Sequence, residues 1–312
     1  MSLNIPTIDI SQGVNSPALI EELSLACEQW GFFQIIGHDI DPGLRSQFFT
    51  AVTKFFELEK PEKSNVSRTA ENFWGYYDKE LTKNRLDKKE IFDIDANLDN
   101  LDNPITSTPI PWPSSMPELE SISKDWLPKC EILSQKLLGA LCLCLGESME
   151  VLNPIFVKEH TSFLRLNYYP ALSSGSSGNS ENLGIHPHTD AGALTLLAQD
   201  TVPGLQVRKG DTWHTIIPIK DSFIVNIGDM IQVWSNDRFK APLHRVLVSP
   251  TKPRYSLPYF YNPSYATICK PLLVNSSEGL YNPVSWQQFR SGRAAGDFVD
   301  QGEEIQISWY RK

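Results

Sequence analysis

Residues 194–227 read LTLLAQDTVPGLQVRKGDTWHTIIPIKDSFIVNI, and this segment displays the β-rich character of the chain most clearly. Short apolar runs alternate there with Gly, Pro and Asp, which is typical of strands joined by tight turns. Similar runs occur on both sides of the segment. Strands are expected at Phe163–Tyr169, Leu194–Gln199, Leu205–Arg208, Trp213–Pro218, Phe223–Ile227, Met230–Trp234, His244–Val248, Tyr255–Tyr261 and Glu304–Ser308. So many short strands at near-regular spacing predict a sandwich or barrel rather than a parallel α/β sheet.

The chain before residue 162 predicts mainly helices, so the fold class expected from the whole pattern is α+β. Apolar residues recur at helical spacing in two N-terminal segments and in one long later segment. The expected elements are a strand at 5–10, a helix at 17–30, a strand at 32–36, a helix at 42–58 and a long helix from Pro117 or Ile122 to Leu145, capped by Gly146.

The organisation expected from these elements is one integrated unit with two regions. Residues 1–115 form an N-terminal helical and mixed region, and residues 116–312 hold the long helix, the strand-rich core and a C-terminal segment. Residues 78–103 are rich in charged side chains, and we expect them to be irregular and to lie on the surface.

Composition favours a small-molecule partner. The 312 residues are 41% hydrophobic with a formal net charge of -9, so the chain can bury a large core and lacks the basic runs that bind nucleic acid or anionic membranes. Neither a secretory signal nor an apolar run of about 18 residues is visible. Five cysteines without a CxxC pair indicate reduced thiols, and hence a cytoplasmic location. No obligate protein partner is inferred.

Two histidines and an aspartate form the strongest functional motif. His188 and Asp190 are two residues apart, so on an extended strand both side chains point to one face. His244 begins a later predicted strand. Two imidazoles and one carboxylate bind ferrous iron on one side and leave the other coordination positions open. His186 competes for the ligand role because it shares the same face, and we favour a place for it behind a ligand or at the pocket rim.

Arg254 and Ser256 follow the second histidine and suit a carboxylate site. An arginine fork and a hydroxyl group hold a carboxylate well, so these residues point to an acid bound at the open metal positions. A zinc hydrolase is an alternative, because the same three donors bind zinc and activate water. That alternative gives Arg254 and Ser256 no purpose, and the chain has no HExxH motif. A non-catalytic, ligand-binding barrel is the remaining alternative.

The first predicted strand of the core has a polar face. Arg165, Asn167 and Tyr169 alternate with apolar residues, so in a barrel they would line the cavity. Tyr169 would then reach the carboxylate held by the arginine, and Arg165 would reach an acidic substrate, with a solvated outer face as the alternative for Arg165. Phe163 and Phe260 are candidate walls of the substrate pocket, although ordinary core packing explains them as well.

Several longer motifs are distributed along the chain. They are IPTID at 5–9, WGFF at 30–33, RLNYYP at 165–170, PHTD at 187–190, LTLL at 194–197, VNIGD at 225–229, HRV at 244–246 and RYSLP at 254–258. By these motifs the chain resembles the isopenicillin N synthase-like branch of the iron(II)/2-oxoglutarate dioxygenases, nearly from end to end. The metal and Arg-x-Ser motifs are specific, whereas the N-terminal motifs are weaker.

The resemblance implies a fold and a set of site residues. The implied fold is a double-stranded β-helix, or jelly roll, with N-terminal helices and a long helix packed outside it. The implied iron ligands are His188, Asp190 and His244, and the implied 2-oxoglutarate residues are Arg254, Ser256, Tyr169 and Asn167. The segment Trp286–Phe298 resembles the one that covers the pocket in relatives, where Gly292 and Gly296 would permit movement.

The resemblance also implies an activity. Fe(II), 2-oxoglutarate and O2 would act together, with ascorbate as a reductant, to form succinate and CO2 and to oxidise a small organic substrate. Hydroxylation, desaturation and cyclisation all belong to this chemistry, and the residues do not choose among them. A 2-oxoglutarate-independent oxidase is the alternative within the family, because isopenicillin N synthase and the ethylene-forming oxidase keep the Arg-x-Ser pair without using 2-oxoglutarate.

Overall fold

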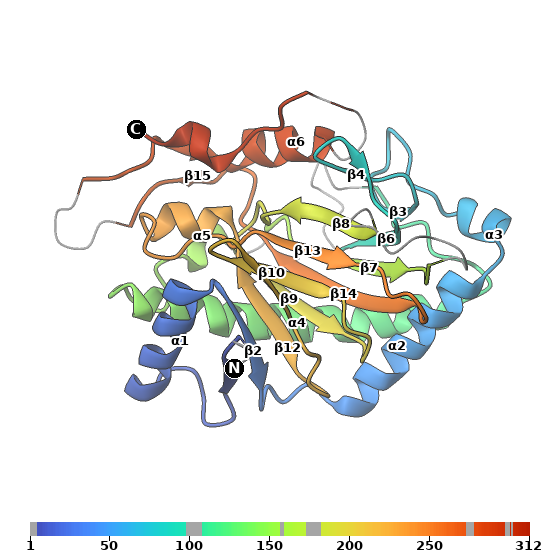
Figure 1. Ribbon diagram of the computed structural model, residues 1–312, viewed down its shortest axis with the longest axis horizontal. Coiled ribbons are helices and arrows are strands. Elements are labelled where there is room, and N and C mark those ends of the chain that lie inside the picture. Colours follow the sequence, from blue (N-terminus) through green and yellow to red (C-terminus); the bar gives the residue numbers. More distant parts are fainter. Residues whose placement is uncertain are drawn as a thin grey trace.

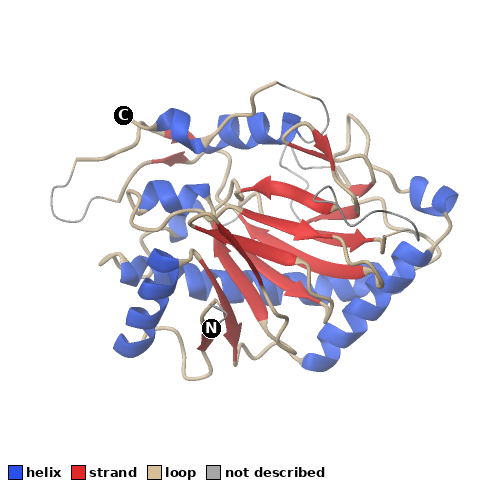
Figure 2. Ribbon diagram, viewed as in Figure 1, coloured by secondary structure: helices blue, strands red, loops and turns tan. Residues whose placement is uncertain are grey.

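The computed structural model describes residues 5–97, 108–156, 159–172, 182–272, 278–296, 300 and 302–312, and it consists of two main β-sheets with helices outside them (Figure 1, Figure 2). The large sheet contains, in order across it, β1 (Thr7–Asp9), β2 (Phe32–Ile36), β12 (Phe223–Ile227), β9 (Leu194–Gln199), β14 (Arg254–Tyr261), β7 (Phe163–Tyr169), β6 (Glu90–Asp95) and β3 (Gly75–Tyr77). The small sheet contains, in order, β11 (Thr212–Thr215), β10 (Leu205–Lys209), β13 (His244–Leu247) and β8 (Leu183–His188). Only β1 and β2 pair in parallel among the strands of these two sheets, so the large sheet is mixed.

The described helices are α1 (Pro17–Gln29), α2 (Pro42–Glu57), α3 (Lys60–Ser64), α4 (Pro117–Cys144), α5 (Asp229–Trp234) and α6 (Trp286–Gly296), with 3-10 turns at Asn153–Ile155 and Ile307–Tyr310. In Figure 1, α1, α2 and α4 lie on the lower side of the molecule, where α4 packs on the large sheet, and α6 lies on the opposite side, above β8. Two small ribbons, β4 (Leu81–Thr82) with β5 (Arg85–Leu86) and β15 (Ile268–Cys269) with β16 (Val284–Ser285), complete the fold.

Local sequence signals explain where the helices begin and end. Ser16 accepts a hydrogen bond from the backbone N–H of Leu19, and Asp41 does the same for α2, with proline in the first turn of each helix. The long helix α4 begins at Pro117, and Gly146 follows its C-terminal cap with a φ of +84°, a conformation that costs glycine little.

The core has two layers because successive strand residues point to opposite faces of the large sheet. On β12, Phe223 and Val225 pack in the layer beneath α1, α2 and α4, whereas Ile224 packs in the layer between the two sheets. The layer between the sheets also contains Val207 and Val246 from the small sheet. The two sheets therefore share one apolar layer, and the polar site lies beside it.

Most predicted strands are confirmed, but two are wrong. Met230–Trp234 belongs to helix α5; nearly all its side chains are buried, so the apolar pattern lacks the helical period that would identify it. Glu304–Ser308 is not a strand, because a 3-10 turn begins at Ile307. A third expected strand is shorter than predicted, since β11 ends at Thr215 rather than at Pro218.

The prediction that residues 78–103 form irregular surface holds only in part for the described residues, which end at 97: Lys83, Arg85 and Leu86 are exposed, but β6 is not surface. Instead, β6 joins the large sheet beside β7, and most of its residues are buried. Arg165 explains how Asp93 is buried there, since its Nε and Nη2 donate to the Asp93 carboxylate at 2.7 and 2.8 Å. Glu80 and Lys89 are buried as an ion pair next to them. Paired charges are buried at much lower cost than isolated ones.

Two further expectations concern the chain as a whole. All five cysteines are free and buried. Within the described residues, no helix has the length and apolar character needed to cross a membrane. Strands from both predicted regions of the chain lie in the large sheet, and the boundary near residue 115 remains a prediction.

Candidate metal centre and pocket

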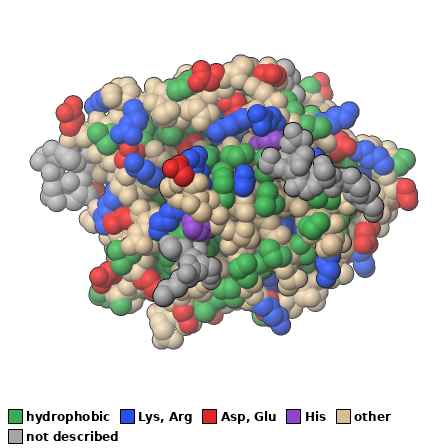
Figure 3. Space-filling model, in the orientation of Figure 1, with side chains coloured by type: hydrophobic (Ala, Val, Ile, Leu, Met, Phe, Trp, Pro, Cys, Tyr) green, Lys and Arg blue, Asp and Glu red, His purple; other side chains and the backbone are tan. Residues whose placement is uncertain are grey.

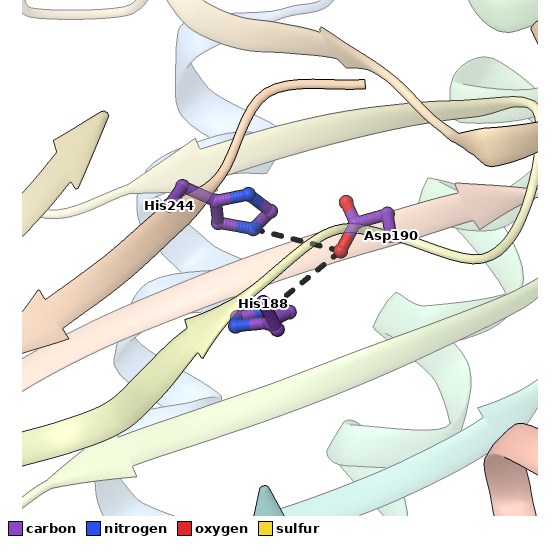
Figure 4. Close-up of side chains that lie close together, drawn as sticks. All are labelled: His188, Asp190 and His244. Atoms are coloured by element: carbon purple, nitrogen blue, oxygen red, sulfur yellow. Dashed lines mark ion pairs between the residues drawn. The ribbon is translucent and has the colours of Figure 1, made fainter. Parts of the chain in front are cut away.

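The fold brings His188, Asp190 and His244 together. His188 ends β8 and His244 begins β13, and the two residues face each other as partners in the small sheet. Asp190 Oδ1 lies 3.7 Å from His188 Nε2 and 3.5 Å from His244 Nε2 (Figure 4). One ligand atom from each residue lies within 4.8 Å of the others, which fits binding of a single ion.

The remaining polar atoms of the triad are held by neighbours that fix its orientation. His188 Nδ1 lies 2.8 Å from the His186 carbonyl and His244 Nδ1 lies 3.1 Å from the Pro242 carbonyl, so each ring donates through Nδ1 and keeps Nε2 for a metal. Thr195 and Asn226 donate to Asp190 Oδ2 at 2.5 and 2.7 Å, which leaves Oδ1 facing the two rings.

The start of α5 holds the loop that carries Asp190. The backbone N–H of Asp229 donates to the Asp190 carbonyl at 2.8 Å. A Cβ at Gly228 would lie 2.2 Å from the Gly192 carbonyl oxygen and 3.0 Å from the Asp190 carbonyl oxygen, so this contact requires glycine. The turn before α5 and the loop of the carboxylate ligand therefore pack as one piece.

Electrostatics favour the protonation states that bind metal. Burial raises the pKa of Asp190, but His244, His188 and the hydrogen bonds from its neighbours lower it more, so the net pKa lies below its ordinary value. Burial, and then the proximity of His244, lowers the pKa of His188. A carboxylate and a neutral imidazole are the forms that coordinate a metal ion.

Arg254 is buried in β14, and its guanidinium lacks a carboxylate at ion-pair distance among the described residues. Its side chain is 1% exposed, and it forms no ion pair with a carboxylate in the described part of the chain. Its Nη2 donates to Gln199 Oε1 at 2.9 Å and its Nη1 to Ser256 Oγ at 3.4 Å, while its Nε has no partner. An unpaired buried guanidinium is costly, so this arrangement is suited to a bound anion.

The other expected carboxylate residues lie beside Arg254. In the register between β14 and β7, Tyr169 is opposite Arg254 and Asn167 is opposite Ser256. The Arg254 guanidinium lies 5.2 Å from the centre of the Tyr169 ring, and Asn167 Nδ2 donates to Ser256 Oγ at 3.4 Å. The polar face predicted for this strand is thus present and faces the cavity.

A pocket that is partly open to solvent connects the two groups. It is lined by all three triad residues, by Asn167, Tyr169, Arg254 and Ser256, and by Phe163, Arg165 and Phe260. Phe163 and Phe260 stack with their ring centres 4.6 Å apart. Arg165 reaches the wall, but Asp93 and Glu80 share its charge. Its role toward a substrate remains a prediction.

Helix α6 forms one wall of the pocket. The sequence linked this segment to the pocket only through the resemblance to the dioxygenase family. Trp286, Arg290 and Arg293 occur four and three residues apart, so they share one helix face, and all three line the pocket. α6 lies above β8 in Figure 1, and Figure 3 shows Lys and Arg side chains gathered in that region beside histidine. Phe298, the expected end of this segment, lies outside the described residues.

Sequence reasoning gave no role to several residues that hold the site in place. They are Asp87, Thr195, Gln199, Asn226 and Asp229. Four of them had a signal, because Thr195, Gln199 and Asn226 are polar residues within or at the end of apolar strands, and Asp229 lies two residues after such a strand. A polar side chain in a buried strand requires a hydrogen-bond partner, and a site is one place to find it.

The chain matches two family models. The 2OG-Fe(II) oxygenase superfamily matches residues 160–263, and the family described as non-haem dioxygenase in morphine synthesis N-terminal matches residues 5–118. The chain is 34% identical to Jasmonate-induced oxygenase 1 of Arabidopsis thaliana over 92% of this chain and 72% of that protein. It is 29% identical to Homoarginine-6-hydroxylase 2-ODD-C23 of Glycine max over 95% of this chain and 98% of that protein.

Solved structures give the same result in three dimensions. The crystal structure of JOX2 in complex with 2OG, Fe and JA has a TM-score of 0.85 and 30% identity, covering 100% of this chain and 90% of that one. The full-length Neurospora crassa T7H in complex with alpha-KG and thymine has a TM-score of 0.82 and 28% identity, covering 93% of this chain and 96% of that one.

Proposed function

The chain belongs to the 2OG-Fe(II) oxygenase superfamily, and from this membership we propose how its own residues perform the activity. His188, Asp190 and His244 hold Fe(II). Arg254 and Ser256 hold the distal carboxylate of 2-oxoglutarate, with Tyr169 and Asn167 beside it.

The observation that carries this proposal is the buried, unpaired guanidinium of Arg254 in the same pocket as the triad. A fork of N–H donors matches a carboxylate, and Ser256 adds a hydroxyl donor. Iron(II) held by His188, Asp190 and His244 would supply, with 2-oxoglutarate and O2, an oxidative decarboxylation that is coupled to oxidation of a substrate. The protein orients these reactants and shapes the space for the substrate.

The finer description of the fold belongs to the same proposal. We assign the two sheets and the apolar layer between them to a double-stranded β-helix, or jelly roll, with α4 packed on the large sheet. The pairing of β8 with β13 and of β14 with β7 and β9 supports this assignment, because it brings the metal ligands and the carboxylate residues to one cavity.

The competing functions have less support. Solved relatives are complexes with 2OG or alpha-KG, which favours 2-oxoglutarate use over the independent oxidase. A zinc hydrolase or a non-catalytic barrel would leave the charge of Arg254 without a purpose. The cytoplasmic location expected from the sequence remains a prediction.

Anaerobic addition of Fe(II) and then 2-oxoglutarate to the metal-free protein is expected to produce a weak visible charge-transfer band. The band requires iron and the keto acid on the same site, so Zn(II) should give none and His188→Ala should lose it. Admission of air should then release succinate in step with oxygen uptake. Iron-loaded protein that shows neither the band nor oxygen uptake dependent on 2-oxoglutarate would contradict the proposal.

The pocket supports a substrate that combines an apolar skeleton with an anionic group. Arg290 has no ion-pair partner in the described residues and lies with its guanidinium 5.4 Å from the centre of the Phe163 ring. Arg293 donates to the Thr189 carbonyl at 2.6 Å, and its Nη1 has no partner. Asp229 is the acidic group near Arg293, and burial raises its pKa to about 6, so it is still mostly ionised at neutral pH and Arg290 is the arginine available to an anion.

Apolar carboxylic acids are therefore expected to stimulate succinate formation more than their methyl esters do. Arg290→Gln should weaken the stimulation by the acids about tenfold or more, since one charged hydrogen bond contributes about 1.5–3 kcal/mol, while affinity for 2-oxoglutarate stays the same. Arg208→Gln is the matched control, because Arg208 is an exposed arginine that pairs with Asp211. Equal stimulation by acids and esters would exclude an anionic substrate group.

A further inference from the structure

β8, the strand that carries His188, is weakly fixed by its own sheet. It lies at the edge of the small sheet, so β13 is its single partner there, and the register shifts twice along that pair. Pro187 has no backbone N–H to donate. An edge strand with irregular pairing requires other contacts if a side chain on it is to be held in one position.

Asp87 supplies such contacts from the segment that was expected to be surface. Its Oδ1 accepts the backbone N–H of His186 at 3.2 Å and the ring Nδ1–H of His186 at 3.0 Å. Its Oδ2 accepts the hydroxyl of Thr82 at 2.7 Å and lies 3.2 Å from Lys89 Nζ. The Asp87 side chain is 0% exposed, so this carboxylate is held on both sides and shielded from water.

The contact continues to the metal ligand through His186. The His186 carbonyl accepts the Nδ1–H of His188 at 2.8 Å, and this hydrogen bond leaves His188 Nε2 facing Asp190. Asp87 holds the backbone N–H of His186, and the carbonyl that accepts from His188 belongs to the same residue. Fixing this N–H therefore also restricts the position of the His186 carbonyl. Hydrogen-bond partners behind a histidine ligand fix its tautomer and its ring orientation.

We propose that Asp87 is a positioning residue for the metal centre, acting on His188 through His186. This inference rests on the proposed function, because it concerns the affinity of the same triad for iron. It also gives His186 a role, since this histidine lies outside the metal cluster yet joins Asp87 to a ligand.

Asp87→Ala is expected to weaken binding of Co(II), used as an air-stable probe of the iron site, by about 10–100-fold, the range typical of partners behind metal ligands. The measurement is an anaerobic titration of the Co(II) visible absorption, with far-UV circular dichroism to verify folding. Glu90→Ala is the matched control, because Glu90 lies three residues away and pairs with Lys63 at 2.7 Å and with the hydroxyl of Tyr76 at 2.8 Å. This control should keep the affinity of the natural protein.

The outcomes separate this inference from the proposed function. If the natural protein binds Co(II), His188→Ala abolishes binding and folded Asp87→Ala binds as tightly as the natural protein, the positioning role is wrong and the metal site stands. If the natural protein itself does not bind Co(II), the proposed function fails. Should Asp87→Ala not fold, Thr82→Val decides: loss of one hydrogen bond to Asp87 should weaken binding about 2- to 10-fold, and an unchanged affinity overturns the inference.

Discussion

Arg254→Met is expected to abolish binding of 2-oxoglutarate and, at the same time, to raise the melting temperature of the protein without ligand. The guanidinium is buried and forms no ion pair within the described residues, so its desolvation costs several kcal/mol in the free protein. Removing it leaves Gln199 Oε1 without its donor, which costs about 1–3 kcal/mol, so we expect a net gain of about 1–2 kcal/mol. Two charged hydrogen bonds to the ligand are lost, a weakening of about 3–6 kcal/mol.

Calorimetric titration with 2-oxoglutarate, together with thermal unfolding in its presence and absence, measures both effects. Arg254→Lys keeps the charge but loses the fork, so its affinity should fall by about 1.5–3 kcal/mol. Arg45→Met is the matched control, because Arg45 is a buried arginine that lies 3.9 Å from Asp221 and donates to the Gln199 carbonyl. It should gain no stability and should still bind 2-oxoglutarate. A Michaelis constant for 2-oxoglutarate that is unchanged in Arg254→Lys would refute the role.

Asp190→Asn is expected to lose metal binding by more than 100-fold, beyond the 10–100-fold loss typical of residues behind the ligands. Thr195 and Asn226 both donate to Asp190 Oδ2, so an amide at this position would turn its oxygen toward them. Its NH2 group would then take the place of Oδ1 and face the two histidines, where it cannot act as a ligand. The substitution therefore removes the negative charge and also presents a donor to the ion.

Titration with Co(II) under anaerobic conditions measures this loss, and Asp229→Asn provides the matched control. Asp229 is also fully buried beside the site, but its carboxylate is not part of the metal cluster. Asp229→Asn removes a neighbouring charge but no member of the metal cluster, so Co(II) affinity should fall far less than it does in Asp190→Asn. Tight Co(II) binding by Asp190→Asn would show that the carboxylate is not a ligand.

Local patterns predicted much of the core because its strands are short, apolar and separated by turn residues. β7, β9 and β12 have the bounds expected from the sequence. The triad could be predicted as well, since His188 and Asp190 are two residues apart in the sequence and His244 begins a strand. Their roles as iron ligands, like those of the carboxylate residues, remain predictions that the titrations above test.

The parts that the sequence did not predict depend on contacts between distant residues. Asp93 is buried because Arg165, 72 residues away, forms two hydrogen bonds with its carboxylate, and no local pattern contains that information. Helix α5 is buried on almost all sides, so its periodicity is hidden. The role of Asp87 depends on His186, which is 99 residues away and lies in β8, the edge strand of the small sheet.

The five buried cysteines can report transient local unfolding of the protein, because a buried thiol reacts with a reagent only when the structure around it opens. Burial raises the pKa of every one of these thiols, so each stays protonated while it is buried. Alkylating reagents that attack thiolates should therefore react very slowly with the folded protein. Cys269 lies in the ribbon that pairs with the strand just before α6, whereas Cys130 lies in α4. Variants would keep either Cys269 or Cys130 as their one cysteine. The alkylation rate of Cys269 would then report detachment of α6 from the pocket, and that of Cys130 would report exposure of the core beneath α4.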